Sequence, residues 1–194
     1  MPRLNSKMKN IKHDLILEKA SEMFESQGFE ELKVSVLAKE LGISVGTIYS
    51  YFESKEGLYG ACVLVQIEQA YEMFKKLFDQ GLDFEQLIER SVEIKFQAMS
   101  MKRKSLETGV LSNPFFFESQ QIEHKDAFQK IYDLYIEPIE AIKKIDMDSM
   151  QLVYLLNAMG NSYILRWLEG DIDSLEGKAQ EVTHLFITMI KGCQ

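Results

Sequence analysis

Residues 11–58 hold three segments with helical periodicity in close succession, and this spacing constrains the fold more than any other feature of the sequence. In the first segment, apolar residues recur at steps of three and four, namely Ile11, Leu15, Ile16, Ala20, Met23 and Phe24. The second spans residues 34–41 and the third spans residues 45–52. Gly28 and Gly42 follow the first two segments, where a glycine commonly ends a helix. Two short helices joined by a glycine turn predict a helix-turn-helix.

The third segment is predicted to bury one face and to leave the other free. Ser44 precedes it and is placed to accept a hydrogen bond from a free amide of the first turn. At about 100° per residue, three apolar residues share one sector: Val45, Ile48 and Phe52. The opposite sector and its edges carry small or hydroxyl-bearing residues: Gly46, Thr47, Tyr49, Ser50 and Tyr51. Such a helix spans roughly 10 Å, close to the width of a DNA major groove, which is about 12 Å.

This free face has two interpretations. In a major groove, Gly46 and Ser50 would allow a close approach of the backbone, and Thr47 would offer a hydroxyl or a methyl group to a base. The two tyrosines would then reach phosphates on either side. Alternatively, the segment is a tight helical corner with half-buried tyrosines, which the spacing alone does not exclude.

The rest of the chain also has helical periodicity. Further helices are predicted at residues 55–78, from Asp83 through Met99, at residues 119–136, from Asp148 to Gly170, and from Asp173 to about Lys191. Pro138 is expected to end or kink the helix that begins near Ser119. Because the sequence has only three prolines and no strand-like alternation, an all-α fold is predicted. Its N-terminal DNA-binding domain would cover residues 1–54, with the helix-turn-helix at about 33–52, and a C-terminal helical bundle would cover residues 55–194.

The charge distribution is compatible with DNA binding, although the net charge is −8. Residues 1–20 contain five basic residues (Arg3, Lys7, Lys9, Lys12 and Lys19) and two acidic ones (Asp14 and Glu18). This end could approach phosphates, while the acidity of the remaining chain would repel DNA from the other faces. A disordered, solvated end is the alternative.

Several classes of protein are disfavoured. No run of eighteen apolar residues is present, so no membrane span is expected, and the polar N-terminus lacks the apolar middle of a secretory signal. The two cysteines, Cys62 and Cys193, are far apart and fit a reducing cytoplasm. The histidines, His13, His124 and His184, show no metal-ligand spacing, and no phosphate-binding loop or nucleophile motif occurs. We therefore expect a cytoplasmic protein that is not an enzyme and that needs no cofactor or metal.

One run of residues resembles the DNA-binding domain of the tetracycline-repressor (TetR) family. The run consists of Gly28-Phe29, Val34, Leu37-Ala38, Gly42-Ile43-Ser44, Gly46-Thr47-Ile48-Tyr49, Tyr51-Phe52 and Ser54-Lys55-Glu56-Gly57-Leu58. The resemblance implies a homodimer in which each subunit presents one helix-turn-helix to half of a palindromic operator. It also implies that Tyr49 and Lys55 hold phosphates, and that positions 45, 46, 47 and 50 lie nearest the bases.

Two positions depart from the family pattern. The family usually starts its second helix with a capping Thr or Ser, whereas this chain has Leu32 and Lys33. We expect the cap to be lost, at about 1 kcal/mol, and Lys33 to replace a phosphate contact by its charge. The family often has a basic residue where Val45 stands, so Val45 indicates fewer phosphate contacts and a contact with a thymine methyl group.

The last two predicted helices are rich in apolar residues and would form a four-helix dimer interface with a second copy. The residues expected there are Leu156, Met159, Gly160, Tyr163, Trp167, Leu185, Phe186 and Met189. An ordinary core within one subunit is the alternative interpretation of the same pattern.

The middle helices supply aromatic and methionine side chains, as an apolar effector pocket would require, although plain core packing gives the same stripes. The candidate pocket residues are Phe74, Phe96, Met99, Phe128, Tyr132, Tyr154, Asn157 and Asn161. A small apolar or amphipathic effector that favours one conformation of the dimer would weaken operator binding by linkage. The sequence therefore predicts a transcriptional regulator, with a repressor released by an effector as the main hypothesis. The alternative is a DNA-binding protein whose C-terminal domain only dimerises or binds a protein.

Overall fold

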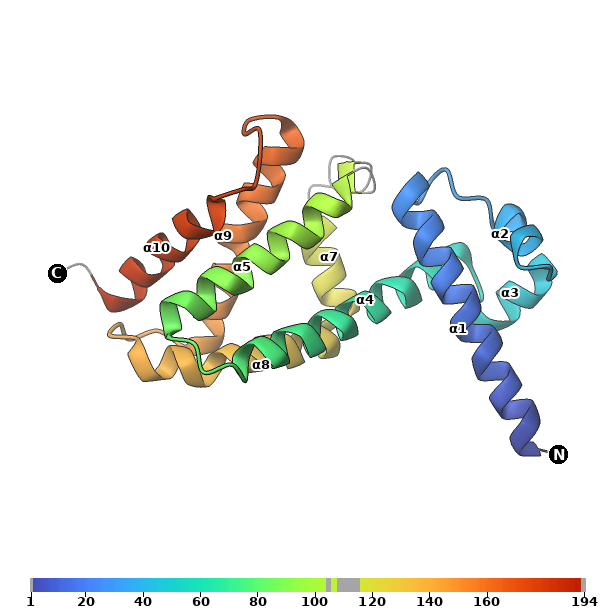
Figure 1. Cartoon of the computed structure of the whole chain (residues 1–194), viewed down its shortest axis with the longest axis horizontal. Helices are drawn as coiled ribbons and strands as arrows, with labels where there is room; N and C mark the ends of the chain where they lie inside the picture. The colour runs from blue at the N-terminus through green and yellow to red at the C-terminus, as the bar shows by residue number, and fades with distance from the viewer. Residues whose placement is uncertain (1, 104–105, 108–115, 193–194) are drawn as a thin grey trace. The chain divides into compact units, whose positions relative to one another are not determined.

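The computed structural model describes residues 2–103, 106–107 and 116–192, and every regular element in these ranges is a helix (Figure 1). The helices are α1 (Pro2–Gln27), α2 (Val34–Glu40), α3 (Val45–Phe52), α4 (Lys55–Phe78), α5 (Phe84–Met101), α7 (Phe116–Glu123), α8 (Lys125–Ile142), α9 (Ser149–Glu169) and α10 (Lys178–Lys191). The predicted all-α fold is confirmed. Within these ranges, no helix is both long and apolar enough to cross a membrane.

The described residues fall into two compact units. The first runs to Gln66 and includes residues 106–107, whereas the second comprises Ile67–Arg103 and residues 116–192. Helix α4 contributes residues to both units. The division of the domains after Ser54 stays a prediction.

The first unit is a small helical domain with its own core. Each of its four helices contributes fully buried apolar side chains, including Ile16 and Ala20 from α1, Leu37 from α2, Ile48 from α3, and Leu58 from α4. The loop after α1 adds Phe29, whose ring stacks on Phe24 at 6.0 Å and meets Tyr59 of α4 edge-on at 5.3 Å. Burial on this scale, at about 25 cal/mol per Å² of apolar surface, fixes α2 and α3 against α1.

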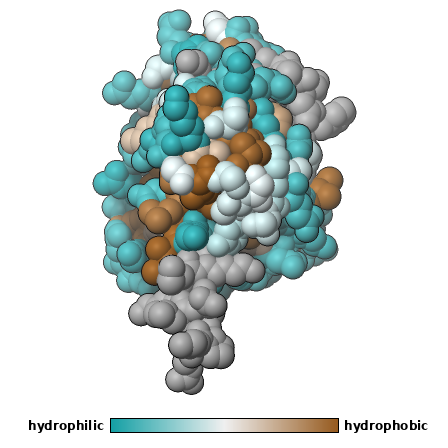
Figure 2. Space-filling model, turned by 90° about the vertical axis from the view of Figure 1, so that its right-hand side faces the viewer, coloured by the Kyte–Doolittle hydropathy of each residue, from teal (hydrophilic) through white to brown (hydrophobic). Residues whose placement is uncertain are grey.

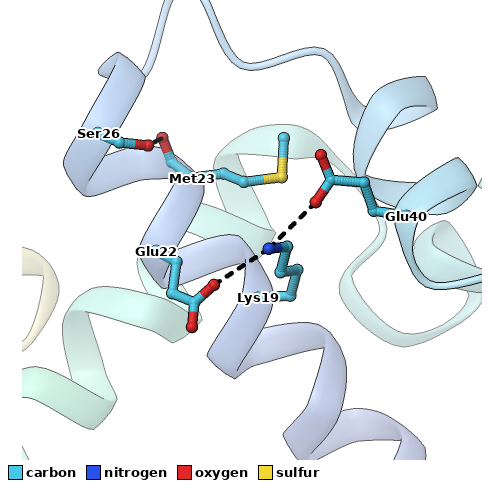
Figure 3. Close-up of polar contacts among 5 residues, drawn as sticks. All are labelled: Lys19, Glu22, Met23, Ser26 and Glu40. Carbon is cyan, nitrogen blue, oxygen red and sulfur yellow. Dashed lines mark hydrogen bonds and ion pairs between the residues drawn. The ribbon is translucent and has the colours of Figure 1, made fainter.

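An ion pair also joins α1 to α2. The ammonium of Lys19 lies 3.1 Å from a carboxylate oxygen of Glu40 at the end of α2 and 3.2 Å from one of Glu22 on its own helix (Figure 3). Its hydrogen bond to Glu40 is the main reason that the pKa of Lys19 is raised. Next to this pair, Met23 is buried and its carbonyl accepts a hydrogen bond from Ser26 at 3.2 Å. The pair is exposed, so it orients the two helices more than it stabilises them.

The second unit is a helical bundle in which α5 packs against α9 and α10, and α8 packs against α9 (Figure 1). Its buried apolar residues come from all four of these helices, among them Ile88, Ile139, Leu152, Ile164, Val182 and Phe186. The part of α4 from Ile67 onward belongs to this unit, and Phe78 meets the ring of Tyr135 on α8 edge-on at 4.7 Å.

The helix boundaries confirm part of the prediction and correct the rest. The structure has α3, α4 and α9 where the sequence predicted them, with Asp148 as the N-cap of α9 and Gly170 at its left-handed end. The single helix predicted at residues 119–136 is wrong, because the chain turns at His124 between α7 and α8. Pro138 does not end α8, which continues to Ile142. The predicted capping by Asp173 is also wrong, because Gly177, with φ +72°, precedes α10.

Candidate functional site

Helix α3 is held at its start and along one face. Its N-cap, Ser44, has an extended backbone and accepts a hydrogen bond from the amide of Thr47 at 3.0 Å, as predicted. Gly42, with φ +64°, makes the turn from α2 that a residue with a Cβ would strain. Ile48 has no exposed surface and Phe52 is buried. The buried side of α3 is therefore fixed in the core of the first unit.

The opposite side of α3 is open to solvent. Gly46 and Ser50 are exposed, Tyr49 is 39% exposed, and Thr47 and Tyr51 are partly exposed. These side chains are therefore not sealed inside the unit, and with tyrosines that are only partly exposed both interpretations of this stretch stay open. Figure 2 shows the side of the molecule that carries α2 and α3, where pale side chains of intermediate hydropathy and apolar ones gather near the centre and hydrophilic ones surround them.

The hydroxyl groups on this side already have local partners. The Ser50 hydroxyl donates to the carbonyl of Thr47 at 2.7 Å, and the hydroxyls of Thr47 and Ser44 share a hydrogen bond at 2.9 Å. These bonds orient the hydroxyls while leaving lone pairs free, so each group can still accept a hydrogen bond from a ligand.

A strained turn joins α3 to α4. Glu53 has φ +62° and ψ −45°, and the amide of Ser54 donates to the carbonyl of Phe52 at 2.6 Å, which closes a three-residue γ-turn. Ser54 then caps α4 by accepting from the amide of Gly57 at 2.9 Å. A Cβ on Gly57 would lie 2.2 Å from the carbonyl oxygen of Phe52. The joint therefore accommodates only glycine at position 57 without rearrangement.

The basic residues predicted to contact phosphates stand at the starts of the helices before and after α3. Lys33 is exposed and is the N-cap of α2 without a side-chain capping bond, so the expected loss of the cap is confirmed. The ammonium of Lys55 lies 4.5 Å from the centre of the Phe29 ring and donates to the carbonyl of Glu30 at 3.2 Å. Val45 is partly exposed. The side chains of Arg3, Lys7 and Lys9 lie outside the described part of the structure.

A contact from α1 was missed by the sequence reasoning. The imidazole of His13 stacks on the ring of Phe52 at 5.0 Å and lies 6.1 Å from that of Tyr51. Position 13 falls outside the apolar stripe of α1, so periodicity gave no signal for it. This contact braces the C-terminal end of α3 against α1.

In the second unit, half of the residues predicted for a dimer interface are buried within the subunit. Leu156, Gly160, Trp167 and Phe186 are buried, Met159, Tyr163 and Met189 are partly buried, and Leu185 is 50% exposed. The surface of α9 and α10 instead carries a mixed set of exposed small and apolar residues: Tyr154, Ala158, Ser162, Leu165 and Leu185. The four buried residues therefore belong to the core of the single chain, as the alternative interpretation predicted.

The candidate effector residues are only partly brought together. Three of them are in contact through their aromatic rings. Phe128 stacks on Tyr132 at 6.0 Å, and Tyr132 meets Tyr154 edge-on at 5.3 Å. Phe74 instead lies near Tyr135, at 6.4 Å. Phe96 is buried, and Met99 is partly buried. A cleft of about 440 Å³ is lined by other residues, at the start of α5 and the ends of α8 and α10: Asp83, Phe84, Glu85, Gln86, Glu89, Ile142, Ile187 and Lys191.

The two remaining candidates, Asn157 and Asn161, lie beside a lysine that the sequence reasoning missed. The ammonium of Lys95 on α5 donates to the side-chain oxygen of Asn157 at 2.7 Å, to that of Asn161 at 2.6 Å, and to the Asn157 carbonyl at 3.2 Å. Burial lowers the pKa of Lys95 to about 7. A lysine in an amphipathic helix is normally assigned to the solvent face, so only the packing of α5 on α9 reveals this group.

Comparisons with known proteins agree with the geometry of the first unit. The family model described as bacterial regulatory proteins, tetR family, matches residues 16–62. The HTH-type transcriptional regulator UidR of Escherichia coli (strain K12) is 32% identical over 88 residues, which cover 45% of this chain and 44% of UidR. The HTH-type regulator SA2364 of Staphylococcus aureus (strain N315) is 22% identical over 176 residues, covering 91% of this chain and 92% of that protein. The chain therefore spans less than half the length of UidR in that match.

Solved structures share the fold. The fatty acid degradation regulator FadR from Bacillus halodurans has a TM-score of 0.69 at 18% identity, over 91% of this chain and 95% of that one. FadR from Bacillus subtilis, solved in complex with stearoyl-CoA, has a TM-score of 0.69 at 14% identity, over 91% of this chain and 98% of that one. The family model covers α2 and α3 and the adjoining parts of α1 and α4, where the capped, half-exposed α3 lies. Residues 16–62, which include this helix-turn-helix, thus match the tetR family of bacterial regulatory proteins, and the whole chain shares its fold with solved regulators of that family.

Proposed function

We propose that this protein is a transcriptional regulator that binds double-stranded DNA as a homodimer, with one α3 helix in the major groove at each half of a palindromic site. The observation that carries this proposal is the division of α3 into two sides. Ile48 and Phe52 anchor it, while Gly46, Thr47 and Ser50 face solvent without a bulky side chain. A short helix with a small polar face suits insertion between two phosphate backbones.

The roles of individual residues follow from their places around α3. Positions 45, 46, 47 and 50 would lie nearest the bases, where the hydroxyls of Thr47 and Ser50 can pair with base edges. Tyr49, Tyr51 and Lys33 would contact phosphates, which position the protein without reading sequence. Lys55 would do so after leaving the carbonyl of Glu30, a neutral partner that a phosphate can replace.

The dimer would use the exposed side of α9 and α10. A two-fold interface needs a surface that is complementary to itself, and the small residues Ala158 and Ser162 would allow close approach of two α9 helices. Leu165 and Leu185, both exposed in the single chain, would supply the apolar contact. The buried residues Leu156 and Phe186 would support these helices from within the subunit.

A small-molecule effector would control DNA binding through the second unit. FadR from Bacillus subtilis was solved with stearoyl-CoA, and the fold shared with that protein supports an effector site here. An effector that binds more tightly to a dimer with the wrong spacing of α3 helices would weaken operator binding by the same factor. A coupling of about 3 kcal/mol corresponds to roughly 150-fold release. On this proposal the protein is a repressor.

One observation favours a second function, DNA binding without small-molecule control. Phe74, Phe96 and Tyr132 are buried, and the 440 Å³ cleft contains none of the predicted pocket residues. In that case the second unit would serve dimerisation or protein contact alone.

Selection of bound fragments from random duplex DNA tests the proposed function directly, because a dimer of this kind should enrich a palindrome. With about 6–8 ionic phosphate contacts per dimer, log K should fall against log salt with a slope of roughly −5 to −7. Lys33→Ala should reduce the magnitude of this slope by about 2, since the dimer carries two copies. Lys76→Ala, an exposed lysine on α4, is the matched control and should leave the slope unchanged. A salt-independent affinity, or enrichment of no common sequence, would contradict the proposal.

A further inference from the structure

The strongest unexplained feature of the second unit is the positive charge of Lys95. Its three ammonium hydrogens meet three oxygens of Asn157 and Asn161 at 2.6–3.2 Å. All three acceptors are uncharged. No carboxylate among the described residues lies within ion-pair distance of this ammonium, whereas Lys19 has two and Lys143 and Lys178 have one each. The hydrogen bonds of Lys95 are therefore satisfied, but its charge is not balanced.

Lys95 is partly buried, and an ammonium with only neutral partners is costly there, since burial removes hydration that neutral amides only partly replace. A methionine of similar length would avoid this cost. The neighbouring helix also makes room for the charge, because a Cβ on Gly160 would lie 3.3 Å from the ammonium nitrogen. A glycine inside a helix is less favourable than alanine. Both features lower stability locally, which is typical of a binding site rather than of a core.

The asparagines add donors to the same place. Their oxygens face the lysine, so their side-chain NH₂ groups remain as donors, and these groups have no protein acceptor among the residues that the structure describes. The two amide NH₂ groups can donate to the two oxygens of a carboxylate, while the ammonium, whose three hydrogens are already used, supplies the positive charge beside them. Because a single positive charge is present, a monoanion is neutralised, whereas a phosphate dianion would keep an excess negative charge.

The surroundings of this donor set are apolar. Val92 and Met99 stand three residues before and four residues after Lys95, so they share its side of α5, and Val92 is buried while Met99 is partly exposed. Tyr154 precedes Asn157 by three residues on α9 and contacts Tyr132. The hydroxyl of Tyr132 is buried and has no hydrogen-bond partner among the described residues. A ligand here needs an apolar body next to its charged head.

We propose that Lys95, Asn157 and Asn161 bind the carboxylate of an amphipathic monocarboxylic acid, and that this acid is the effector of the regulator. The effector role of the acid rests on the proposed function, but the carboxylate site itself does not depend on DNA binding. Lys95 provides the counter-charge, the two amides orient the carboxylate, and the apolar side of α5 contacts the body of the ligand.

Matched pairs of ligands test this proposal on the full-length protein. Octanoate is compared with octanamide, and 4-phenylbutyrate with 4-phenylbutyramide, by calorimetry and thermal shift at pH 6.5. At least one acid should bind more tightly than its amide. Lys95→Met should weaken binding of that acid roughly 10- to 100-fold, since it removes the charge that neutralises the carboxylate and leaves that carboxylate unpaired at a partly buried site, while the amide should bind as before. Lys95→Gln keeps an NH₂ donor for the asparagine oxygens and covers the case in which Lys95→Met does not fold.

The outcomes separate this proposal from the proposed function. If no acid binds better than its amide, or if both Lys95 variants bind the acid with unchanged affinity, the carboxylate site is overturned. If the protein selects a palindrome and is released equally by acid and amide, the regulator stands and the inference fails. If it selects no DNA sequence but binds the acid through Lys95, the site stands and only its role as an effector site fails.

Discussion

Gly46→Ala should affect the stability of α3 and its DNA affinity differently. Position 46 has room for a methyl group within the folded chain, but in the proposed complex it faces the DNA groove. A Cβ there would meet only the Ser44 hydroxyl oxygen, at 3.7 Å, which is an ordinary contact. The backbone at Gly46 is helical and its φ is not positive. Alanine is favoured over glycine within helices by up to about 1 kcal/mol, so the free energy of unfolding should be unchanged or should rise by up to that amount.

The effect on DNA should be the opposite. If α3 lies in the major groove with Gly46 against the bases, the added methyl group pushes the helix outward and disturbs the contacts of both subunits. A displacement that removes one or two hydrogen bonds per subunit, at about 1 kcal/mol each, lowers the affinity of the dimer by roughly 30-fold or more. Fluorescence anisotropy with the selected operator, alongside urea unfolding of the same preparation, measures both quantities.

Gly57→Ala is the contrasting variant, in the first turn of α4 just after α3. Its Cβ would lie 2.2 Å from the Phe52 carbonyl oxygen, against 3.4–4 Å for an ordinary contact, so the joint must shift by more than 1 Å. Overpacking of this kind typically costs about 1–3 kcal/mol, and Gly57→Ala should lose both stability and DNA affinity. If Gly46→Ala unfolds normally and still binds the operator with unchanged affinity and salt slope, α3 does not face the bases and the reasoning fails.

Three further changes test other parts of the structure. Ser44→Ala removes the oxygen that accepts from the Thr47 amide and should lower the free energy of unfolding in urea by about 1 kcal/mol; an unchanged midpoint would contradict the capping role. Leu185→Glu places a charge on a side chain that is 50% exposed in the single chain, so it should convert dimer to monomer in sedimentation experiments without unfolding the subunit, and a persistent dimer would place the interface elsewhere. The pKa of Lys95 is about 7 in the folded chain and about 10.4 in an unfolded one, so unfolding takes up a proton between these values and stability should rise from pH 7 to 10. Lys95→Met should remove up to about 1.4 kcal/mol per pH unit of that rise, and identical pH profiles for both proteins would refute the burial of the ammonium.

The sequence predicted the helices whose ends carry local signals. Ser44, Asp148 and Gly170 each act within one turn of the chain, through a capping oxygen or a left-handed backbone, and the structure has helix ends at all three. Where the signal was ambiguous, the prediction failed. Asp173 resembles a capping residue, but Gly177 adopts φ +72° four residues later and sets the start of α10. Pro138 removes one backbone donor from α8, yet packing of Tyr135 and Ile139 in the core keeps the helix continuous.

Burial could be predicted for α3 but not for α9, and the number of neighbours explains the difference. A short helix at the edge of a small domain has one buried side. Spacing residues at about 100° around the helix axis was therefore enough to predict that Ile48 and Phe52 are buried. Helix α9 touches α5, α8 and α10, so apolar residues occur around much of its circumference. Leu156 and Trp167 then look the same in the sequence as Leu165, although only Leu165 is exposed.

Lys95 shows the limit of sequence patterns most clearly, because the relevant information is a distance between two helices. Periodicity assigns a lysine to solvent, and nothing near position 95 in the sequence signals Asn157 or Asn161, more than sixty residues later. Besides Pro138, two residues violate local rules. Glu53 adopts a left-handed backbone without being glycine at the end of α3, and Lys95 carries an unbalanced charge beside α9. Since such violations lower stability unless they serve another purpose, their positions support the α3–α4 joint and the Lys95 site as the parts of this fold that function depends on.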